Sequence, residues 1–145
     1  MPAPRAIRLG IVSTAPPSSG SIAATVLLVD DNPVLLRQTE EYLKERRFAV
    51  FCTSSPFSVI TMVRDHNPQV VVLDVMMPGL DGERVYEFLE KTGTLTRAPL
   101  VIFYSAIAEE QLYKMCKGRP RASYVLKSDG PRALREAILK RLSAA

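Results

Sequence analysis

The sequence predicts an α/β fold in three layers, in which helices cover both faces of a doubly wound, parallel, five-stranded sheet. Short apolar segments alternate five times with longer segments whose apolar residues recur at helical spacing. The segment VVVL, which starts at Val70, has no polar alternation, as expected for a strand that is covered on both faces. Strict strand–helix alternation is typical of a parallel sheet with helical crossovers.

The first elements follow an N-terminal segment of different composition. Residues 1–24 contain four prolines among many serines and alanines, and we expect a disordered or flexible tail there. The folded domain is expected to span residues 25–145. Residues 25–29, TVLLV, form its first strand, and an Asn-Pro pair opens a helix over residues 32–47.

The four remaining strand–helix pairs are separated by turn residues or by a change of periodicity. Pro68, for example, ends the second helix, because proline cannot continue a helical hydrogen-bond ladder. The remaining expected strands are residues 48–53, 69–75, 100–104 and 123–126. The remaining expected helices are residues 54–67, 83–91, 108–117 and 131–142.

Length and composition limit the class of protein. A chain of 145 residues with 47% apolar content is the size of one globular domain that can bury its own core. No apolar run approaches the length of a membrane span, and the patch at residues 7–12 is too short for a signal-peptide core. Cys52 and Cys116 have no metal-site spacing and are expected to be free thiols, which suit the reducing cytosol. We expect a soluble, cytoplasmic chain without membrane contact.

The net charge of +4 is concentrated in the last third of the chain. Residues 106–145 hold nine lysines and arginines against four acidic residues. A basic face attracts an acidic protein or a nucleic acid, although a merely solvated face is an equally good interpretation. No aromatic residues interleave with these charges and no nucleic-acid motif is present, so we expect no nucleic-acid binding by this chain.

Polar side chains stand at the carboxyl ends of four expected strands. They are Asp30 and Asp31 after the first strand, Asp74 at the end of the third, Ser105 after the fourth and Lys127 after the fifth. These ends meet at one edge of a parallel sheet, and open α/β sheets bind ligands at that edge. The sequence therefore predicts that the five side chains converge in space.

Their chemistry suggests a metal and a phosphate. Three carboxylates in one cleft repel one another, and Mg²⁺, which prefers carboxylate and carbonyl oxygens, relieves that repulsion. Lys127 supplies a positive charge suited to a phosphate oxygen, and Ser105 supplies a hydroxyl donor. Asp74 ends the central strand and is the carboxylate best placed to act as a nucleophile.

From about residue 25 to residue 142 the chain resembles the receiver domain of two-component response regulators, in its single-domain, chemotaxis-regulator-like form. The resemblance rests on the acidic pair, the segment DVMMPGLDG that begins with Asp74, the Ser105-Ala106 pair, and Lys127 with Tyr124 three residues earlier. Residues 31, 74, 105 and 127 are separated by 43, 31 and 22 positions, which also fits the family. The resemblance implies a flavodoxin-like (βα)5 fold and a phosphorelay signalling function.

The resemblance also implies the chemistry of each site residue. Asp74 would accept a phosphoryl group from a histidine kinase or phosphotransfer protein. Asp31 and Asp74, together with the backbone carbonyl of Met76, would bind Mg²⁺, and Asp30 would act through water. Lys127 would pair with a phosphoryl oxygen.

A switch and an output are implied as well. Ser105 would move toward the phosphoryl group and Tyr124 would turn inward in response, which is the two-state element that a switch needs. A downstream protein would dock on the face made by the fourth helix, fifth strand and fifth helix, where the basic excess lies. We expect no enzymatic activity beyond autodephosphorylation. We expect that reaction to be slow, because the apolar Met76 and Ile107 would flank the path of the hydrolytic water.

One residue departs from the family pattern. Ser128 follows Lys127 where the family usually has proline, often after a cis bond. A cis bond without proline costs about 2.5–4 kcal/mol, so we expect a trans bond here, or a cis bond under strain. A degenerate receiver that binds partner proteins without phosphate is the alternative function that Ser128 leaves open.

Other interpretations of the acids fit less well. Asp30 or Asp31 could stabilise the start of the following helix, but this does not explain Asp74. Phosphohydrolases with an aspartate nucleophile carry a second acid two residues after the first, whereas here the acids are adjacent and Asn32 follows. A dinucleotide-binding fold is excluded because no glycines follow the first strand.

Overall fold

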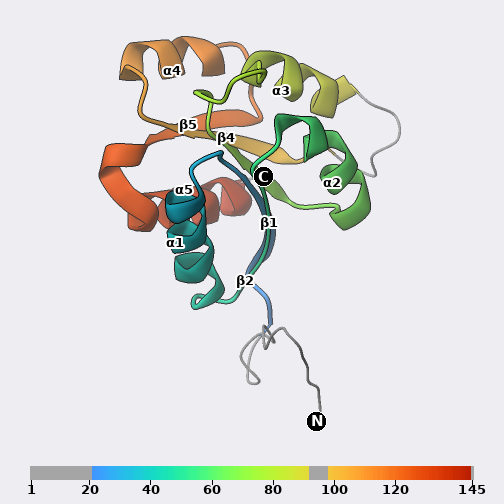
Figure 1. Cartoon of the computed structure of the whole chain (residues 1–145), viewed down its shortest axis with the longest axis vertical. Helices are drawn as coiled ribbons and strands as arrows, with labels where there is room; N and C mark the ends of the chain where they lie inside the picture. Colours follow the sequence, from blue (N-terminus) through green and yellow to red (C-terminus); the bar gives the residue numbers. More distant parts are fainter. Residues whose placement is uncertain (1–20, 92–97, 145) are drawn as a thin grey trace.

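The computed structural model describes residues 21–91 and 98–144, which form one five-stranded parallel sheet with the strand order β2-β1-β3-β4-β5 (Figure 1). The strands are β1 (Ala24–Val29), β2 (Phe48–Thr53), β3 (Val70–Leu73), β4 (Leu100–Ser105) and β5 (Ala122–Leu126). The chain moves outward from β1 to β2 and then crosses back to β3. The predicted doubly wound sheet is confirmed, and its direction reverses between β1 and β3, where such sheets bind ligands.

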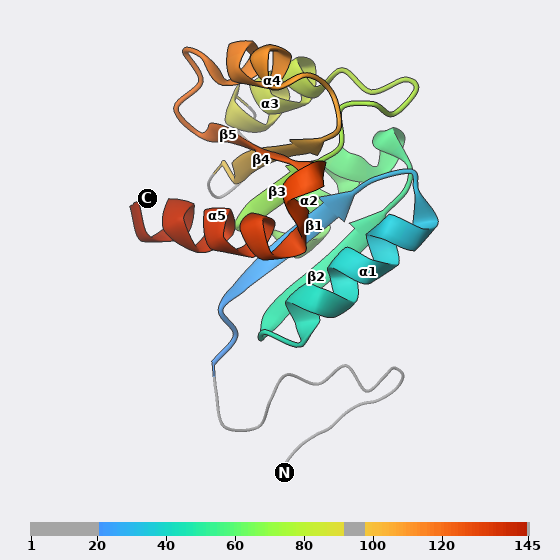
Figure 2. The same cartoon turned by 90° about the vertical axis from the view of Figure 1, so that its left-hand side faces the viewer.

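Helices cover both faces of this sheet, as predicted. Two of them share a hydrophobic core on one face, and three share the core on the other face. The first pair is α1 (Pro33–Lys44) and α5 (Gly130–Ala144). Figure 2 shows α1 and α5 together on one side of the sheet. The other three are α2 (Val59–His66), α3 (Gly82–Lys91) and α4 (Glu109–Cys116). The flavodoxin-like arrangement in three layers is therefore confirmed.

Alternate residues of β1 serve the two cores. Val26 and Leu28 pack in the core that includes Leu43 of α1, whereas Leu27 and Val29 pack in the opposite core. All five side chains are buried. Each contributes about 1.5–3 kcal/mol relative to an exposed position, which makes the sheet a rigid support for the loops at its edge.

The pairing register decides which loops meet at the carboxyl edge. Val29, the last residue of β1, is opposite Leu73, the last residue of β3. The next residues, Asp30 and Asp74, therefore leave neighbouring strands at the same height.

Two predicted elements are shorter in the structure. The third strand was expected over residues 69–75, but β3 ends at Leu73, because β1 provides no pairing partner beyond Val29. The second helix was expected over residues 54–67, but α2 starts at Val59. A 3-10 turn, Pro56–Ser58, precedes it, and the side chain of Ser55 caps that turn.

The N-terminal boundary is described only in part. Residues 1–20 lie outside the described ranges, so the predicted tail remains a prediction. β1 begins at Ala24, one residue before the expected strand, and the amide of Ala23 donates to the carbonyl of Arg47. Within the described ranges, the helices are all too short or too polar to cross a bilayer.

Candidate functional site

Two buried carboxylates lie side by side where β1 and β3 end. Asp30 is 7% exposed and Asp74 is 6% exposed. Their backbones are fixed by the sheet, because the Asp30 amide donates to the Thr53 carbonyl and the Asp74 amide donates to the Val29 carbonyl. The parallel pairing of β1 with both neighbouring strands therefore brings two acids, 44 positions apart in the sequence, into one site.

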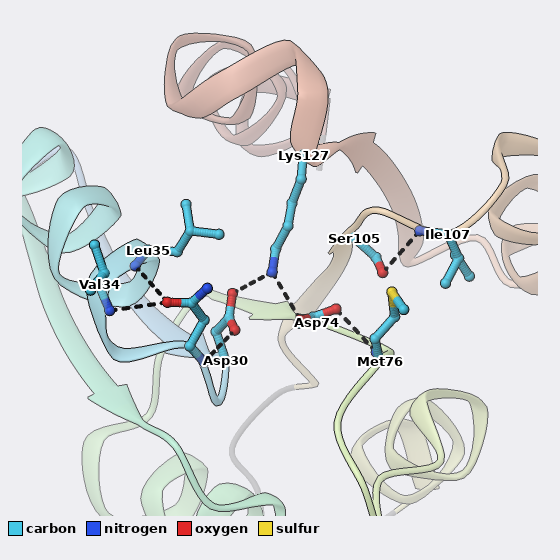
Figure 3. Close-up of polar contacts among 9 residues, drawn as sticks. Asp30, Val34, Leu35, Asp74, Met76, Ser105, Ile107 and Lys127 are labelled. Atoms are coloured by element: carbon cyan, nitrogen blue, oxygen red, sulfur yellow. Dashed lines mark hydrogen bonds and ion pairs between the residues drawn. The ribbon is translucent and has the colours of Figure 1, made fainter.

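Lys127 joins these two carboxylates (Figure 3). Its Nζ lies 2.6 Å from Oδ2 of Asp30 and 2.9 Å from Oδ2 of Asp74. Lys127 follows β5 and is the first residue of a 3-10 turn, η2 (Lys127–Asp129). Its long side chain spans the edge of the sheet from β5 to the acids, so the predicted convergence of these three residues is seen in the structure.

The ammonium of Lys127 stays charged in this position. Burial by itself lowers the pKa of Lys127, but hydrogen bonds to Asp30 and Asp74 and their negative charges more than offset it. The net result is a pKa above the ordinary lysine value. Lys127 is therefore a permanent positive charge beside both carboxylates at neutral pH.

Each carboxylate is also oriented by the backbone two residues after it. Oδ1 of Asp30 accepts from the Asn32 amide at 2.9 Å, and Oδ1 of Asp74 accepts from the Met76 amide at 3.0 Å. Local turns of this kind fix an aspartate side chain on its own loop. Because Oδ1 is used locally, Oδ2 of each acid faces Lys127.

The cap of α1 is Asn32 and not one of the acids. Its Oδ1 accepts from the amides of Val34 and Leu35 at 3.1 and 3.2 Å. Asparagine is among the best N-cap residues, so α1 does not need the side chain of Asp30 or Asp31 as its cap. The Asn-Pro pair was expected to open this helix, and the structure confirms that the helix starts there, with Asn32 as its N-cap and Pro33 as its first residue.

Asp31 completes an acidic cluster at the surface. It is exposed, and one carboxylate oxygen from each of Asp30, Asp31 and Asp74 lies within 4.8 Å of the others. Three carboxylates and one ammonium leave two negative charges, which matches a divalent cation in charge and in ligand type. The cluster therefore fits a metal ion. Met76 contributes its amide to Asp74, and its side chain is 58% exposed.

The bond between Lys127 and Ser128 is trans, as expected for serine in this position. The described residues contain no cis peptide bond. Ser128 is exposed within η2, and the trans geometry still allows Lys127 to contact both acids.

Ser105 lies at the same edge but makes a different contact. It is the last residue of β4 and not the residue after it, and it is fully buried. Its Oγ accepts from the Ile107 amide at 3.5 Å (Figure 3). β4 pairs Ser105 with Leu126, which places it beside the start of the Lys127 turn, although its hydroxyl is bonded to its own loop and not to the acids.

Tyr124 points away from the acids, toward α4. Its phenol donates to Oε2 of Glu109 at 2.9 Å, in an exposed contact. This hydrogen bond, together with burial and the nearby charge of Glu109, raises the pKa of Tyr124. Sequence reasoning named Tyr124 but missed Glu109, which stands in the first turn of α4.

The basic residues of the last third are used mostly within the protein. Arg119 forms ion pairs with Glu83 at 3.1 Å and Glu87 at 3.3 Å, both on α3. Arg121 donates to the carbonyls of Ala98 and Pro99. Lys117 remains exposed. Arg119 and Arg121 therefore connect elements of the fold, and the charge of Arg119 is paired with acids outside the last third.

Comparison with known proteins agrees with this geometry. The family described as "Response regulator receiver domain" matches residues 26–139. The sensor protein GacS of Pseudomonas syringae pv. syringae is 31% identical over 142 residues, which cover 95% of this chain and 15% of GacS. The protein PilG of Pseudomonas aeruginosa is 26% identical over 94 residues, which cover 65% of this chain and 67% of PilG.

A third relative matches a shorter part of the chain. The protein-glutamate methylesterase/protein-glutamine glutaminase of Photorhabdus laumondii is 36% identical over 87 residues, which cover 59% of this chain and 24% of the relative. The chain thus spans less than a quarter of the sensor protein and about a quarter of the methylesterase.

Solved structures agree on the fold. A response regulator from Desulfuromonas acetoxidans superposes with a TM-score of 0.70 at 18% identity, covering 83% of this chain and 97% of the other. The receiver domain of the Francisella response regulator 1452 superposes with a TM-score of 0.67 at 25% identity, covering 83% and 98%. With a family match over most of its length and receiver domains as its structural neighbours, the chain belongs to the response regulator receiver domains of two-component systems.

Proposed function

We propose that this chain is a phosphoacceptor switch in which Asp74 receives a phosphoryl group. The observation that carries the proposal is the position of Asp74, which is buried at the end of the central strand with its Oδ2 2.9 Å from the ammonium of Lys127. A rigid strand end, a permanent positive charge and two further carboxylates are the parts that a phosphoryl-accepting aspartate needs.

The donor in the proposed reaction is a phosphohistidine on a kinase or phosphotransfer protein. A lone pair of an Asp74 carboxylate oxygen attacks phosphorus, so that an O–P bond forms while the N–P bond of the phosphohistidine breaks. The electron pair of that bond stays on the imidazole nitrogen, which takes up a proton. Lys127 then pairs with a phosphoryl oxygen, exchanging one anionic partner for another at the same place.

The acidic cluster is the proposed Mg²⁺ site. Asp31 and Asp74, with the carbonyl of Met76, would bind the ion directly, and Asp30 would act through water. When bound, Mg²⁺ supplies positive charge for the phosphoryl oxygens. Each of the buried carboxylates uses two of about four acceptor positions for Lys127 and a backbone amide, so acceptor capacity remains for a cation.

In the proposed switch, Ser105 and Tyr124 respond to phosphorylation, and a partner protein docks on the face made by α4, β5 and α5. Tyr113, which is 58% exposed, and the exposed Lys117 give that face an apolar and a basic contact for a partner protein. Arg119 and Arg121 are left out of it, because both are bonded within the fold. A cytoplasmic location belongs to the proposal and is supported by the two free thiols.

The test is phosphorylation of the full chain by acetyl phosphate, followed by intact-mass measurement with Mg²⁺ and with chelator. We expect one phosphoryl group, only when the metal is present, and none on Asp74→Asn. Asp65→Asn is the matched control, because Asp65 is an exposed aspartate on α2, away from the site. Equal uptake by Asp74→Asn and wild type would refute the assignment.

One observation favours the alternative, a receiver that binds partners without phosphate. Lys127 already satisfies Oδ2 of both buried acids, so the site is stable without added ligands. Wild-type protein that takes up no phosphoryl group from acetyl phosphate or from a cognate kinase would support this alternative.

A further inference from the structure

A small cavity lies on the inner side of the acidic site. Its polar lining consists of Asp30 and Asp74 together with two hydroxyl-bearing side chains, Thr39 of α1 and Tyr104 of β4. The rest of the lining is aliphatic. The cavity offers about 10 Å³ to the centre of a water-sized sphere, which is close to the minimum that one water molecule needs.

The two hydroxyl side chains are unusual for their surroundings. Thr39 is 6% exposed and Tyr104 is 5% exposed, and Tyr104 packs in the core beneath α1 and α5. Within the described ranges, neither hydroxyl takes part in a hydrogen bond with another protein group. Both hydroxyl oxygens retain some surface that water can touch. A water molecule in this cavity can therefore supply the hydrogen bond that each hydroxyl lacks within the protein.

Tyr104 lies near enough to the acidic site for the charges there to act on its phenol. Burial raises the pKa of Tyr104, and the charges of Lys127, Asp30 and Asp129 also act on it. Its phenol therefore remains protonated at neutral pH and can donate a hydrogen bond. The side chains of β4 alternate, so Tyr104 lies on the α1–α5 side of the strand, opposite to the side of its neighbour Ser105.

We propose that this cavity binds one structural water molecule, and that Thr39 and Tyr104 act through it as positioning residues for the Asp30 and Asp74 carboxylates. Two hydroxyls and two carboxylates give the water up to four polar partners, the number that buried waters typically use. Lys127 and the backbone amides orient the carboxylates from outside, and the water supports them from inside the sheet.

The inference depends on the proposed Mg²⁺ site for only one of its consequences. Groups that hydrogen-bond to metal-binding carboxylates orient them, and their removal typically weakens metal binding by about 10- to 100-fold. The water itself and its effect on stability are properties of the metal-free protein. A failure of Mg²⁺ binding and a failure of the water site can therefore be told apart.

The test uses the full chain and the variants Thr39→Val, Tyr104→Phe and their combination. Thr39→Ser retains the hydroxyl, and Tyr42→Phe removes a phenol that does not line the cavity. Three readouts are compared: the melting temperature without Mg²⁺, the Kd for Mg²⁺ by calorimetry, and the cavity density in a high-resolution crystal structure of the metal-free protein.

We expect density for one water, a lower melting temperature for both single variants, and a Kd for Mg²⁺ raised about tenfold. In the double variant, the melting temperature and the affinity for Mg²⁺ should fall no further than in the more affected single variant, because both hydroxyls act through the same water. Thr39→Ser and Tyr42→Phe should retain the wild-type Kd. An empty cavity, or a melting temperature that rises in Tyr104→Phe because an unpaired hydroxyl has been removed, would overturn the proposal. If wild type binds no Mg²⁺, the proposed metal site is wrong, and density and melting temperature still decide on the water.

Discussion

The phenol of Tyr124 on β5 donates a hydrogen bond to the carboxylate of Glu109 on α4, with 2.9 Å between the two oxygens. This contact connects the start of α4, the helix that follows the Ser105 loop, with the strand that precedes Lys127. In the proposed switch, Tyr124 must leave Glu109 before it can turn inward. Glu109 is therefore expected to stabilise the outward state.

Removing that acceptor should release Tyr124. In Glu109→Ala, we expect the pKa of Tyr124 to fall toward the ordinary tyrosine value of about 10, because the hydrogen bond and charge that raise it are lost. Ring NMR signals of Tyr124, assigned with Tyr124→Phe, give both this titration and the inward population. Glu110→Ala is the control, because Glu110 faces Lys114 instead. An unchanged titration in Glu109→Ala would contradict the model of a tethered ring.

Removing Lys127 should destabilise the protein in the absence of metal. Lys127→Met leaves two buried carboxylates without their cation, and breaking a buried pair in this way costs about 3–5 kcal/mol. Added Mg²⁺ should recover part of this loss, because it restores positive charge to the cluster. Chemical denaturation with and without Mg²⁺ measures both effects, and Lys140→Met, at an exposed position on α5, is the control.

The same loss should depend on pH. Since folding raises the pKa of Lys127, its contribution to stability is complete below the unfolded lysine pKa of about 10.4 and disappears as the pH rises through the folded value. The difference in unfolding free energy between wild type and Lys127→Met should therefore be constant near neutrality and shrink above about pH 10.4. A difference that changes between pH 6 and about pH 9 would point to another titrating group.

Asp31 should matter for the metal and not for the fold. It is exposed, so Asp31→Asn is expected to change the metal-free unfolding free energy by no more than about 0.5 kcal/mol. In wild type, Mg²⁺ at a hundred times its Kd should add about 2.7 kcal/mol of stability, and this increment should be largely lost in Asp31→Asn. Asp65→Asn should retain the increment. If Asp31→Asn retained this Mg²⁺-dependent increment, Asp31 would not be a ligand of the metal site.

The phosphorylated state should be long-lived. Met76 is 58% exposed beside Asp74, and Ile107 is half-buried on the Ser105 loop, and neither side chain can orient a water for attack on phosphorus. We expect Met76→Asn to accelerate the decay of phospho-Asp74 about tenfold, less than the 10²–10⁴-fold range of true acid–base groups. Met76→Leu should leave the decay unchanged. Decay of the wild type within seconds would contradict this prediction.

Neither cysteine should react as a thiolate near neutral pH. Burial, followed by the charge and hydrogen bond of Glu40, raises the pKa of Cys52 to about 12, and burial raises that of Cys116 to about 11. Folding thus favours the neutral thiols, and their contribution to stability is present below the unfolded pKa of about 8.5 and lost as the pH rises toward 11 and 12. Iodoacetamide at pH 8 should label the urea-unfolded chain quickly and the native chain slowly. Fast labelling of native protein would show that these thiols open to solvent.

The helices and strands could be predicted from the sequence because the patterns that mark them are local. Apolar period, prolines and turn residues mark the five strands, and alternation predicts a parallel sheet without any knowledge of contacts. The element boundaries that differ from the prediction are those set by contacts with another strand or with a capping side chain. β3 ends at Leu73 because β1 ends opposite it, and α2 starts late because Ser55 first caps a separate turn.

The sequence also identified the chemical groups of the site and the edge on which they lie. Asp30, Asp74 and Lys127 were expected to converge because each follows a parallel strand, and the structure brings them within ion-pair distance. Residue type and strand order determine that much. Only tertiary packing decides which pairs form, namely Arg119 with two acids of α3 and Tyr124 with Glu109, and which side chains line one cavity, as Thr39 and Tyr104 do. These relationships depend on rotamers and distances between elements remote in sequence, and no local pattern of residues encodes those.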